Sequence, residues 1–108
     1  MQSITRQYLE QMNETDHEDF VLINVLPRET FNEKHIRTSI NIPHEADDFT
    51  ETVEKVAGGK DRIIVVYCAN FECPASTKAA EKLDKAGFRQ IFDYEGGTEE
   101  WLANHKHH

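Results

Sequence analysis

Hydrophobic residues along the chain fall into two repeating patterns. Nearly unbroken apolar runs at 20–25 and 62–67 have the length of a strand and leave no polar face, which is typical of parallel strands covered on both sides. Shorter strands are expected at 39–42, where Pro43 ends the run, and at 90–94. Around these strands, apolar residues recur at helical spacing and predict helices at 4–13, 30–34, 50–57, 75–86 and 99–103.

Strands and helices therefore alternate from one end of the chain to the other. This order predicts an α/β fold in which helices cover a parallel sheet. The 108 residues suit a single domain, 1–108, and show no internal repeat or linker. The two ends, 1–3 and 105–108, are expected to be frayed tails.

Acidic side chains outnumber basic ones by 20 to 12, and the formal net charge is −8. This balance argues against nucleic acid and anionic membranes as partners, because both attract basic patches. Residues 1–12 lack the basic start and the apolar run of a signal peptide, and no stretch approaches the ~20 apolar residues of a membrane span. A cytoplasmic protein is expected.

The two cysteines, Cys68 and Cys73, are too few for a disulfide scaffold and indicate chemistry or metal ligation. No histidine pair has the spacing that would complete a zinc site with them, so no metal is expected. Cys68 directly follows the strand at 62–67, and a helix begins within the next several residues. In open α/β sheets, ligands bind in the crevice beyond the carboxyl ends of such strands.

The loop after Cys68 is a candidate site for a sulfur or an anion. If it wraps around the Cys68 sulfur, backbone N–H groups and the following helix N-terminus favour the thiolate and lower the Cys68 pKa from about 8.5. The same groups would hold a persulfide sulfur or the oxygens of an anion. The alternative is that Cys68 is a small buried hydrophobic residue, as free cysteine often is. The expected binding loop comprises Ala69, Asn70, Phe71, Glu72 and Cys73.

Four segments stand in a fixed order along the chain: LINVL at 22–26, FNEKHI with SINIP at 31–43, VVYC with TKAAEKL and AGF at 65–88, and EGGTEEW at 95–101. Together they resemble the rhodanese homology domain over nearly the whole chain. The resemblance implies a parallel five-stranded sheet with helices on both faces. It implies no cofactor.

In that family, the loop cysteine takes sulfane sulfur from a donor and passes it to a thiophilic acceptor. The resemblance therefore implies a sulfurtransferase in which Cys68 is the catalytic nucleophile and carries a persulfide. Covalent catalysis of this kind divides the transfer into two displacements at sulfur. The implied partners are a small-molecule donor (a persulfide, a polysulfide or thiosulfate) and a thiol acceptor, which includes another sulfur-transfer protein.

The loop departs from the usual family pattern of Cys, four residues, Arg and Ser. Cys73 holds the arginine position, Glu72 adds a negative charge, and no arginine or lysine lies between Cys68 and Lys78. Without the charge-assisted hydrogen bonds of an arginine, dianionic thiosulfate is expected to be a poorer donor than a persulfide of low charge.

Cys73 resembles the second cysteine of a rhodanese subgroup whose loop reads Cys-x4-Cys before TKAA. One interpretation makes it a resolving thiol that attacks the Cys68 persulfide, releases sulfide and leaves a disulfide, or that protects Cys68 from over-oxidation. The other makes it a small residue at the start of a helix. Both interpretations remain open at this point.

Two other classes of function compete with sulfur transfer. A non-catalytic interaction module is one, because folds are reused without their chemistry. A persulfide or redox sensor based on Cys68 and Cys73 is a further alternative, and its mechanism overlaps with that of the sulfurtransferase. A phosphatase or arsenate reductase is disfavoured, because such chemistry depends on a loop arginine. Among other residues, Phe71 is expected to be exposed, His35 to make a structural hydrogen bond, and Ser76 or Thr77 to cap the helix.

Overall fold

The computed structural model describes residues 1–15 and 19–104. Its strands are β1 (Gln2–Ile4), β2 (Phe20–Asn24), β3 (Ile40–Asn41), β4 (Ile63–Tyr67) and β5 (Ile91–Tyr94). Its helices are α1 (Arg6–Thr15), α2 (Arg28–Glu33), α3 (Phe49–Ala57), α4 (Ala75–Lys85) and α5 (Gly97–Asn104). The predicted strands and helices are all present, with boundaries that shift by a few residues.

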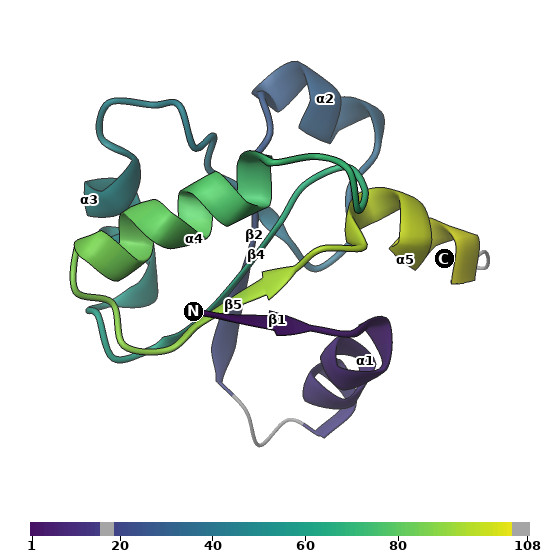
Figure 1. Ribbon diagram of the computed structural model, residues 1–108, viewed down its shortest axis with the longest axis horizontal. Helices are drawn as coiled ribbons and strands as arrows, with labels where there is room; N and C mark the ends of the chain where they lie inside the picture. The colour runs from purple at the N-terminus through teal and green to yellow at the C-terminus, as the bar shows by residue number, and fades with distance from the viewer. Residues whose placement is uncertain (16–18, 105–108) are drawn as a thin grey trace.

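The strands form one parallel sheet in the order β1-β5-β4-β2-β3 (Figure 1). The strongest predicted strand, β4, lies at its centre, and Tyr67 at its end pairs with Asn24 of β2 and Tyr94 of β5. The predicted α/β class with a parallel five-stranded sheet is confirmed.

Alternate side chains of β4 enter two separate hydrophobic cores. Ile64 and Val66 pack with residues of α3 and α4, whereas Val65 and Tyr67 pack with residues of α1 and α5. Both faces of the sheet are therefore covered, which explains why the β4 sequence has no polar face. Among the described residues, no helix has the length and apolarity needed to cross a membrane.

The expectation that residues 1–3 are frayed is corrected. Gln2 to Ile4 pair in parallel with Phe92 to Tyr94, so β1 closes one edge of the sheet. Because Gln2 and Ser3 are exposed on this edge strand, they carry no apolar pattern and only the backbone pairing holds them. The other expected tail, 105–108, lies outside the described residues.

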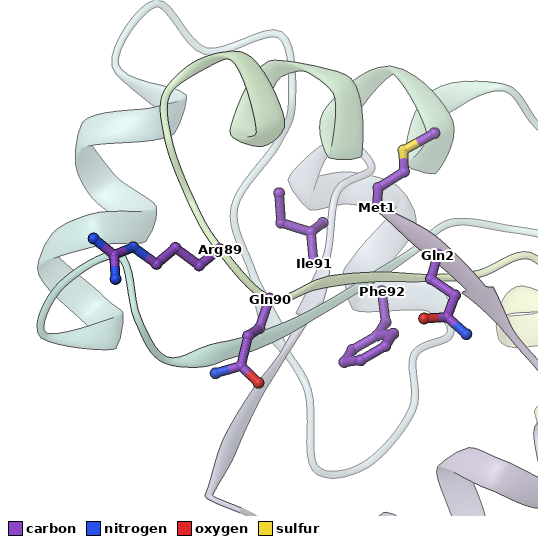
Figure 2. A pocket seen from close by; sticks show the side chains of 6 residues that line it. All are labelled: Met1, Gln2, Arg89, Gln90, Ile91 and Phe92. Atoms are coloured by element: carbon purple, nitrogen blue, oxygen red, sulfur yellow. The ribbon is translucent and has the colours of Figure 1, made fainter.

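A shallow hollow lies where β1 and β5 begin (Figure 2). Its lining includes the exposed Met1 and the side chains of Arg89 and Gln90 before β5. This hollow is at the amino ends of the strands, whereas Cys68 follows the carboxyl end of β4. It is therefore separate from the predicted site.

The first turn of α5 holds the end of β4 in place. The Thr98 N–H donates to the Cys68 carbonyl at 2.9 Å, and the Glu99 N–H donates to the Ala69 carbonyl at 2.9 Å. Gly97 permits this approach with a φ of 66°, because a Cβ there would lie 2.4 Å from the Cys68 oxygen. The turn needs glycine for both its backbone conformation and its space.

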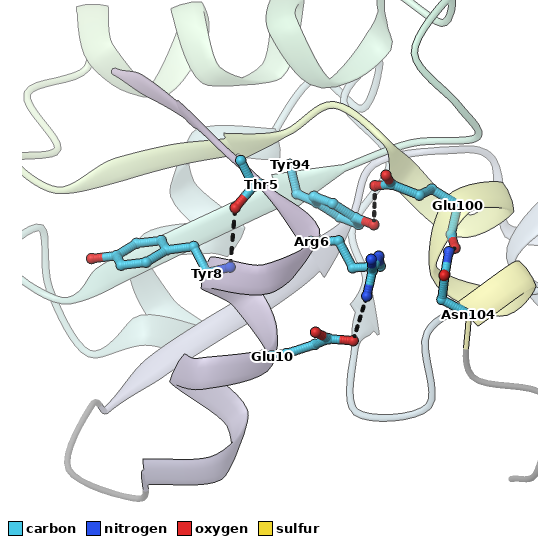
Figure 3. Close-up of polar contacts among 7 residues, drawn as sticks. All are labelled: Thr5, Arg6, Tyr8, Glu10, Tyr94, Glu100 and Asn104. Atoms are coloured by element: carbon cyan, nitrogen blue, oxygen red, sulfur yellow. Dashed lines mark hydrogen bonds and ion pairs between the residues drawn. The ribbon is translucent and has the colours of Figure 1, made fainter.

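The rest of α5 is tied to the sheet by Tyr94, whose hydroxyl donates to Glu100 Oε1 at 2.7 Å (Figure 3). Burial, and then the Glu100 carboxylate, raise the pKa of Tyr94, so the hydroxyl keeps the proton that it donates. The adjacent Arg6–Glu10 ion pair in α1 is 2.9 Å long. The Tyr94–Glu100 hydrogen bond joins β5 to α5 and helps to keep the first turn of α5 at the Cys68 carbonyl.

One buried carboxyl, Asp93, lies in β5 with an exposed fraction of 1%. Thr77 Oγ1 of α4 donates to its Oδ2 at 3.0 Å. Burial raises the Asp93 pKa above 3.8, Glu95 adds to the increase, and hydrogen bonds from Ser76 and Thr77 partly offset it. The folded protein therefore binds this proton more tightly than the unfolded chain does.

Gly97→Ala is expected to destabilise the protein by about 3 kcal/mol, because the new Cβ would meet main-chain atoms of Cys68 and Ala69. Gly58→Ala is the matched control, since Gly58 has a similar φ of 78° but nothing within 4 Å of the point where a Cβ would stand. The control is expected to cost about 1 kcal/mol from backbone strain alone. Urea unfolding of both variants measures the difference, and equal losses would contradict the steric role of Gly97.

Asp93→Asn is expected to change how stability depends on pH. In the wild type, stability is lost as pH rises from the unfolded pKa of 3.8 through the higher folded pKa, because the folded state then gives up a proton that it holds more tightly. The variant has no such group and does not lose this stability. As pH rises across this interval, the free energy of unfolding of the variant should therefore increase relative to that of the wild type. Urea unfolding as a function of pH measures this gain, with the exposed Asp84→Asn as control. Parallel curves would contradict the raised pKa.

Candidate active site

Cys68 is the first residue after β4, and the loop 69–74 carries the chain from there to α4. Its neighbours in the sheet are the ends of β2 and β5. The structure thus places Cys68 at the carboxyl edge of a parallel sheet, where ligands bind in folds of this class. The strand, loop and helix have the predicted order.

The thiol of Cys68 is fully buried, with an exposed fraction of 0%. Its Sγ donates to the Cys73 carbonyl at 3.3 Å and lies 3.6 Å from Ser76 Oγ. Burial raises the Cys68 pKa, and the neighbouring Cys73 thiol raises it further, against smaller opposing effects from the Ser76 hydroxyl and N–H. The expectation of a lowered Cys68 pKa is therefore wrong, because removing the sulfur from water outweighs the helix terminus.

Cys73 has the opposite character, although the two sulfurs interact. Burial by itself would raise the Cys73 pKa, but hydrogen bonds from the Cys68 thiol and from the N–H groups of Ala69 and Ala75 lower it overall. Its side chain is half-buried, and both cysteines are free thiols. The surroundings of the two sulfurs therefore favour the thiolate at Cys73 more than at Cys68.

Asn70 organises the loop between the cysteines. Its Oδ1 accepts a hydrogen bond from the Glu72 N–H at 3.0 Å, and its carbonyl accepts one from the Cys73 N–H at 3.1 Å. Its amide group donates to Glu99 Oε2 of α5 at 3.1 Å. The N–H groups of Glu72 and Cys73 are thus used within the loop, and that of Ala69 helps to lower the pKa of Cys73.

Phe71 projects from the same loop and is 67% exposed, which confirms the prediction for this side chain. Hollows lie on two sides of it, one towards α5 and the other towards the start of α1. Acidic side chains line both hollows, namely Glu95, Glu99 and Glu100. The surroundings of the loop are therefore apolar at Phe71 and negative around it.

The first turn of α4 differs from the predicted cap. Pro74 occupies the N-cap position, and no side chain caps the helix. The Ser76 hydroxyl lies against Cys68, and the Thr77 hydroxyl donates to Asp93. Sequence reasoning missed Asp93, although an acidic residue inside an otherwise apolar strand is a recognisable signal of a buried polar contact.

His35 has the structural role that was predicted for it. Its Nδ1–H donates to the Phe31 carbonyl at 2.7 Å, and its ring stacks on that of Phe31 with centroids 3.9 Å apart. Across residues 1–15 and 19–104, no three His, Cys, Asp or Glu side chains are grouped so that they could hold a metal ion.

Comparisons with known proteins agree with this arrangement. The thiosulfate sulfurtransferase GlpE of Coxiella burnetii is 25% identical over 88 residues, which cover 81% of this chain and 76% of that protein. The protein of the same name from Pseudomonas savastanoi pv. phaseolicola is 31% identical over 86 residues, covering 79% and 74%.

Solved structures show the same fold. The BH2092 protein from Bacillus halodurans has a TM-score of 0.81 at 27% identity, covering 95% of this chain and 72% of that one. The rhodanese-like domain of the Alr3790 protein from Anabaena sp. has a TM-score of 0.79 at 27% identity, covering 94% and 74%. The family described as "Rhodanese-like domain" matches residues 5–104. With Cys68 and Cys73 at the two ends of a Cys-x4-Cys loop, this chain belongs to the rhodanese-like domain family.

Proposed function

We propose that this protein is a sulfurtransferase in which Cys68 carries sulfane sulfur as a persulfide. The observation that carries the proposal is the position of Cys68 between the central strand β4 and helix α4, in a family whose curated relatives include thiosulfate sulfurtransferases. The donor is a persulfide or polysulfide, with thiosulfate as a poorer one. The acceptor is a thiol, either of a small molecule or of another sulfur-transfer protein.

The burial of Cys68 suits storage of reactive sulfur. A persulfide on this side chain would be shielded from water and from bulk oxidants, since the thiol has no exposed surface. The Ser76 hydroxyl and the first turn of α4 lie beside the sulfur and can donate to an anionic outer sulfur. The loop must open, or relay the sulfur, for outside molecules to exchange with it.

The reaction consists of two displacements at sulfur. In the first, a cysteine thiolate bonds to the outer sulfur of the donor R–S–SH, and R–S⁻ leaves. In the second, an acceptor thiolate bonds to the outer sulfur of the Cys68 persulfide, and the Cys68 thiolate leaves. Electrons balance without an external oxidant or reductant.

A redox sensor is the second candidate, because Cys68 and Cys73 are adjacent free thiols. A non-catalytic interaction module would leave these thiols without a role. Phosphatase or arsenate reductase activity is disfavoured by the acidic Glu72 and by the lack of Arg or Lys from 69 to 77.

Incubation with a small-molecule persulfide is expected to add the mass of one sulfur atom to Cys68, and a thiol acceptor is expected to remove it. Intact-mass measurement, with mapping of the modified cysteine, tests this. Cys68→Ser should hold no sulfur at position 68 and should not turn over. A wild-type protein that gains no sulfur, or a Cys68→Ser variant with full turnover, would contradict the proposed function.

Persulfide is expected to support faster turnover than thiosulfate at equal concentration. Glu72→Arg should raise kcat/KM for thiosulfate by about tenfold, equivalent to about 1.4 kcal/mol, because it replaces a repelling charge by an attracting one. Glu81→Arg makes the same charge change on an exposed face of α4, away from the loop, and is the matched control. If wild type used thiosulfate as well as persulfide, or if both variants gained equally, local charge in the loop would not govern donor choice.

A further inference from the structure

We propose that Cys73 takes the sulfur from the donor and then passes it to Cys68 within the loop. This inference rests on the proposed function, since it keeps Cys68 as the final carrier. It assigns to Cys73 a catalytic step that comes before the Cys68 persulfide. The two interpretations left open by the sequence, a resolving thiol and a small residue, are both replaced by an acceptor role.

Access to the two sulfurs supports this order. A displacement at sulfur requires the nucleophile to approach the donor's S–S bond end-on, with room for the leaving group behind it. Cys68 has an exposed fraction of 0%, and its thiol points inward to the Cys73 carbonyl and Ser76 Oγ. Cys73 is half-buried and lies in the loop just before α4. Cys73 is therefore the more accessible of the two thiols to an external donor while the loop stays closed.

The polar groups around Cys73 support the same order. The N–H groups of Ala69 and Ala75 and the neighbouring Cys68 thiol favour the ionised form of its sulfur, whereas the buried Asp93 opposes its ionisation. Because the thiolate is the attacking form of cysteine, these donors favour Cys73 as the first nucleophile. The Cys68 thiol donates to the Cys73 carbonyl at 3.3 Å, and burial raises its pKa, which favours its protonated form.

Both steps of the relay balance in atoms and electrons. The Cys73 thiolate bonds to the outer sulfur of R–S–SH, the donor's S–S bond breaks, and R–S⁻ leaves. The sulfur of Cys68 then bonds to the outer sulfur on Cys73, the S–S bond to Cys73 breaks, and the Cys68 proton passes to Cys73. The products are a Cys68 persulfide and a Cys73 thiol, with no net oxidation.

Attack on the other sulfur gives different products. If Cys68 bonded to the inner sulfur of the Cys73 persulfide, a Cys68–Cys73 disulfide would form and HS⁻ would leave. A thiol reductant would then be needed for each cycle. The proposed relay needs none, so sulfide release separates the two routes.

The test follows sulfur on the intact 108-residue chain during exposure to a small-molecule persulfide, with quenching by an alkylating agent. Fragmentation of peptide 63–78, which holds both cysteines, locates the sulfur. In wild type, the label is expected on Cys73 at early times and on Cys68 later. In Cys68→Ser, it should stop on Cys73 and go no further. In Cys73→Ser, loading of Cys68 should slow by about tenfold or more, because the more ionised thiol is lost.

Alkylation without any sulfur donor gives an independent readout. Cys73 should react with iodoacetamide before Cys68, and Cys68→Ala should move the midpoint of its pH–rate curve upward by removing one donor. This arm does not depend on Cys73→Ser folding correctly.

The possible outcomes distinguish a failure of the relay from a failure of the proposed function. Loading of Cys68 at the wild-type rate in Cys73→Ser would overturn the relay and leave the Cys68 sulfurtransferase intact. Disulfide formation with sulfide release as the first products would also overturn it. A wild-type protein that takes up no sulfur on either cysteine would overturn the proposed function itself.

Discussion

The geometry of the site depends on the contact between the first turn of α5 and the end of β4. Two main-chain N–H groups of α5 donate to the carbonyls of Cys68 and Ala69, and Gly97 lets the two backbones meet. The first two residues after β4, Cys68 and Ala69, are thereby fixed to α5 although the strand has ended. Successive side chains continue to alternate, so Tyr67 faces the core of α1 and α5, and Cys68 faces that of α3 and α4.

This alternation explains why the thiol is buried and not presented to solvent. A residue on the inner face of a strand covered by two helices has no route to the surface unless the loop turns it outward, and Asn70 holds the loop back over it. The burial raises the Cys68 pKa. The same burial that protects a sulfur on Cys68 also makes the Cys68 thiol less accessible and less ionised. In the proposed relay, the less buried Cys73 reacts with the donor, and Cys68 stores the sulfur.

The fold was largely predictable from sequence because it rests on patterns that sequence shows directly. The apolar run of β4 and the helical spacing of α4 identified a covered parallel sheet, and the strand–loop–helix order located Cys68. The edge strand β1 was missed because Gln2 and Ser3 are held by backbone pairing, which leaves no side-chain pattern. The Cys68 pKa was predicted with the wrong sign because it depends on which face the residue takes and on how far the loop closes. Neither can be read from one sequence, and the same holds for the amides that point at Cys73.

The charges around the loop, like the pair of thiols, favour a sulfur donor of low charge. An arginine in the place of Cys73 would attract a dianion to a buried nucleophile and bind it with charge-assisted hydrogen bonds. This loop has a thiol there instead, with the acidic Glu72 beside it and the exposed Phe71 at its surface. Amide donors stabilise one negative charge on a sulfur, but they do not compensate two charges on an arriving anion next to a carboxylate. A donor of low charge with an apolar portion fits both the charge and the surface of the loop, and it would deliver its sulfur to the half-buried Cys73.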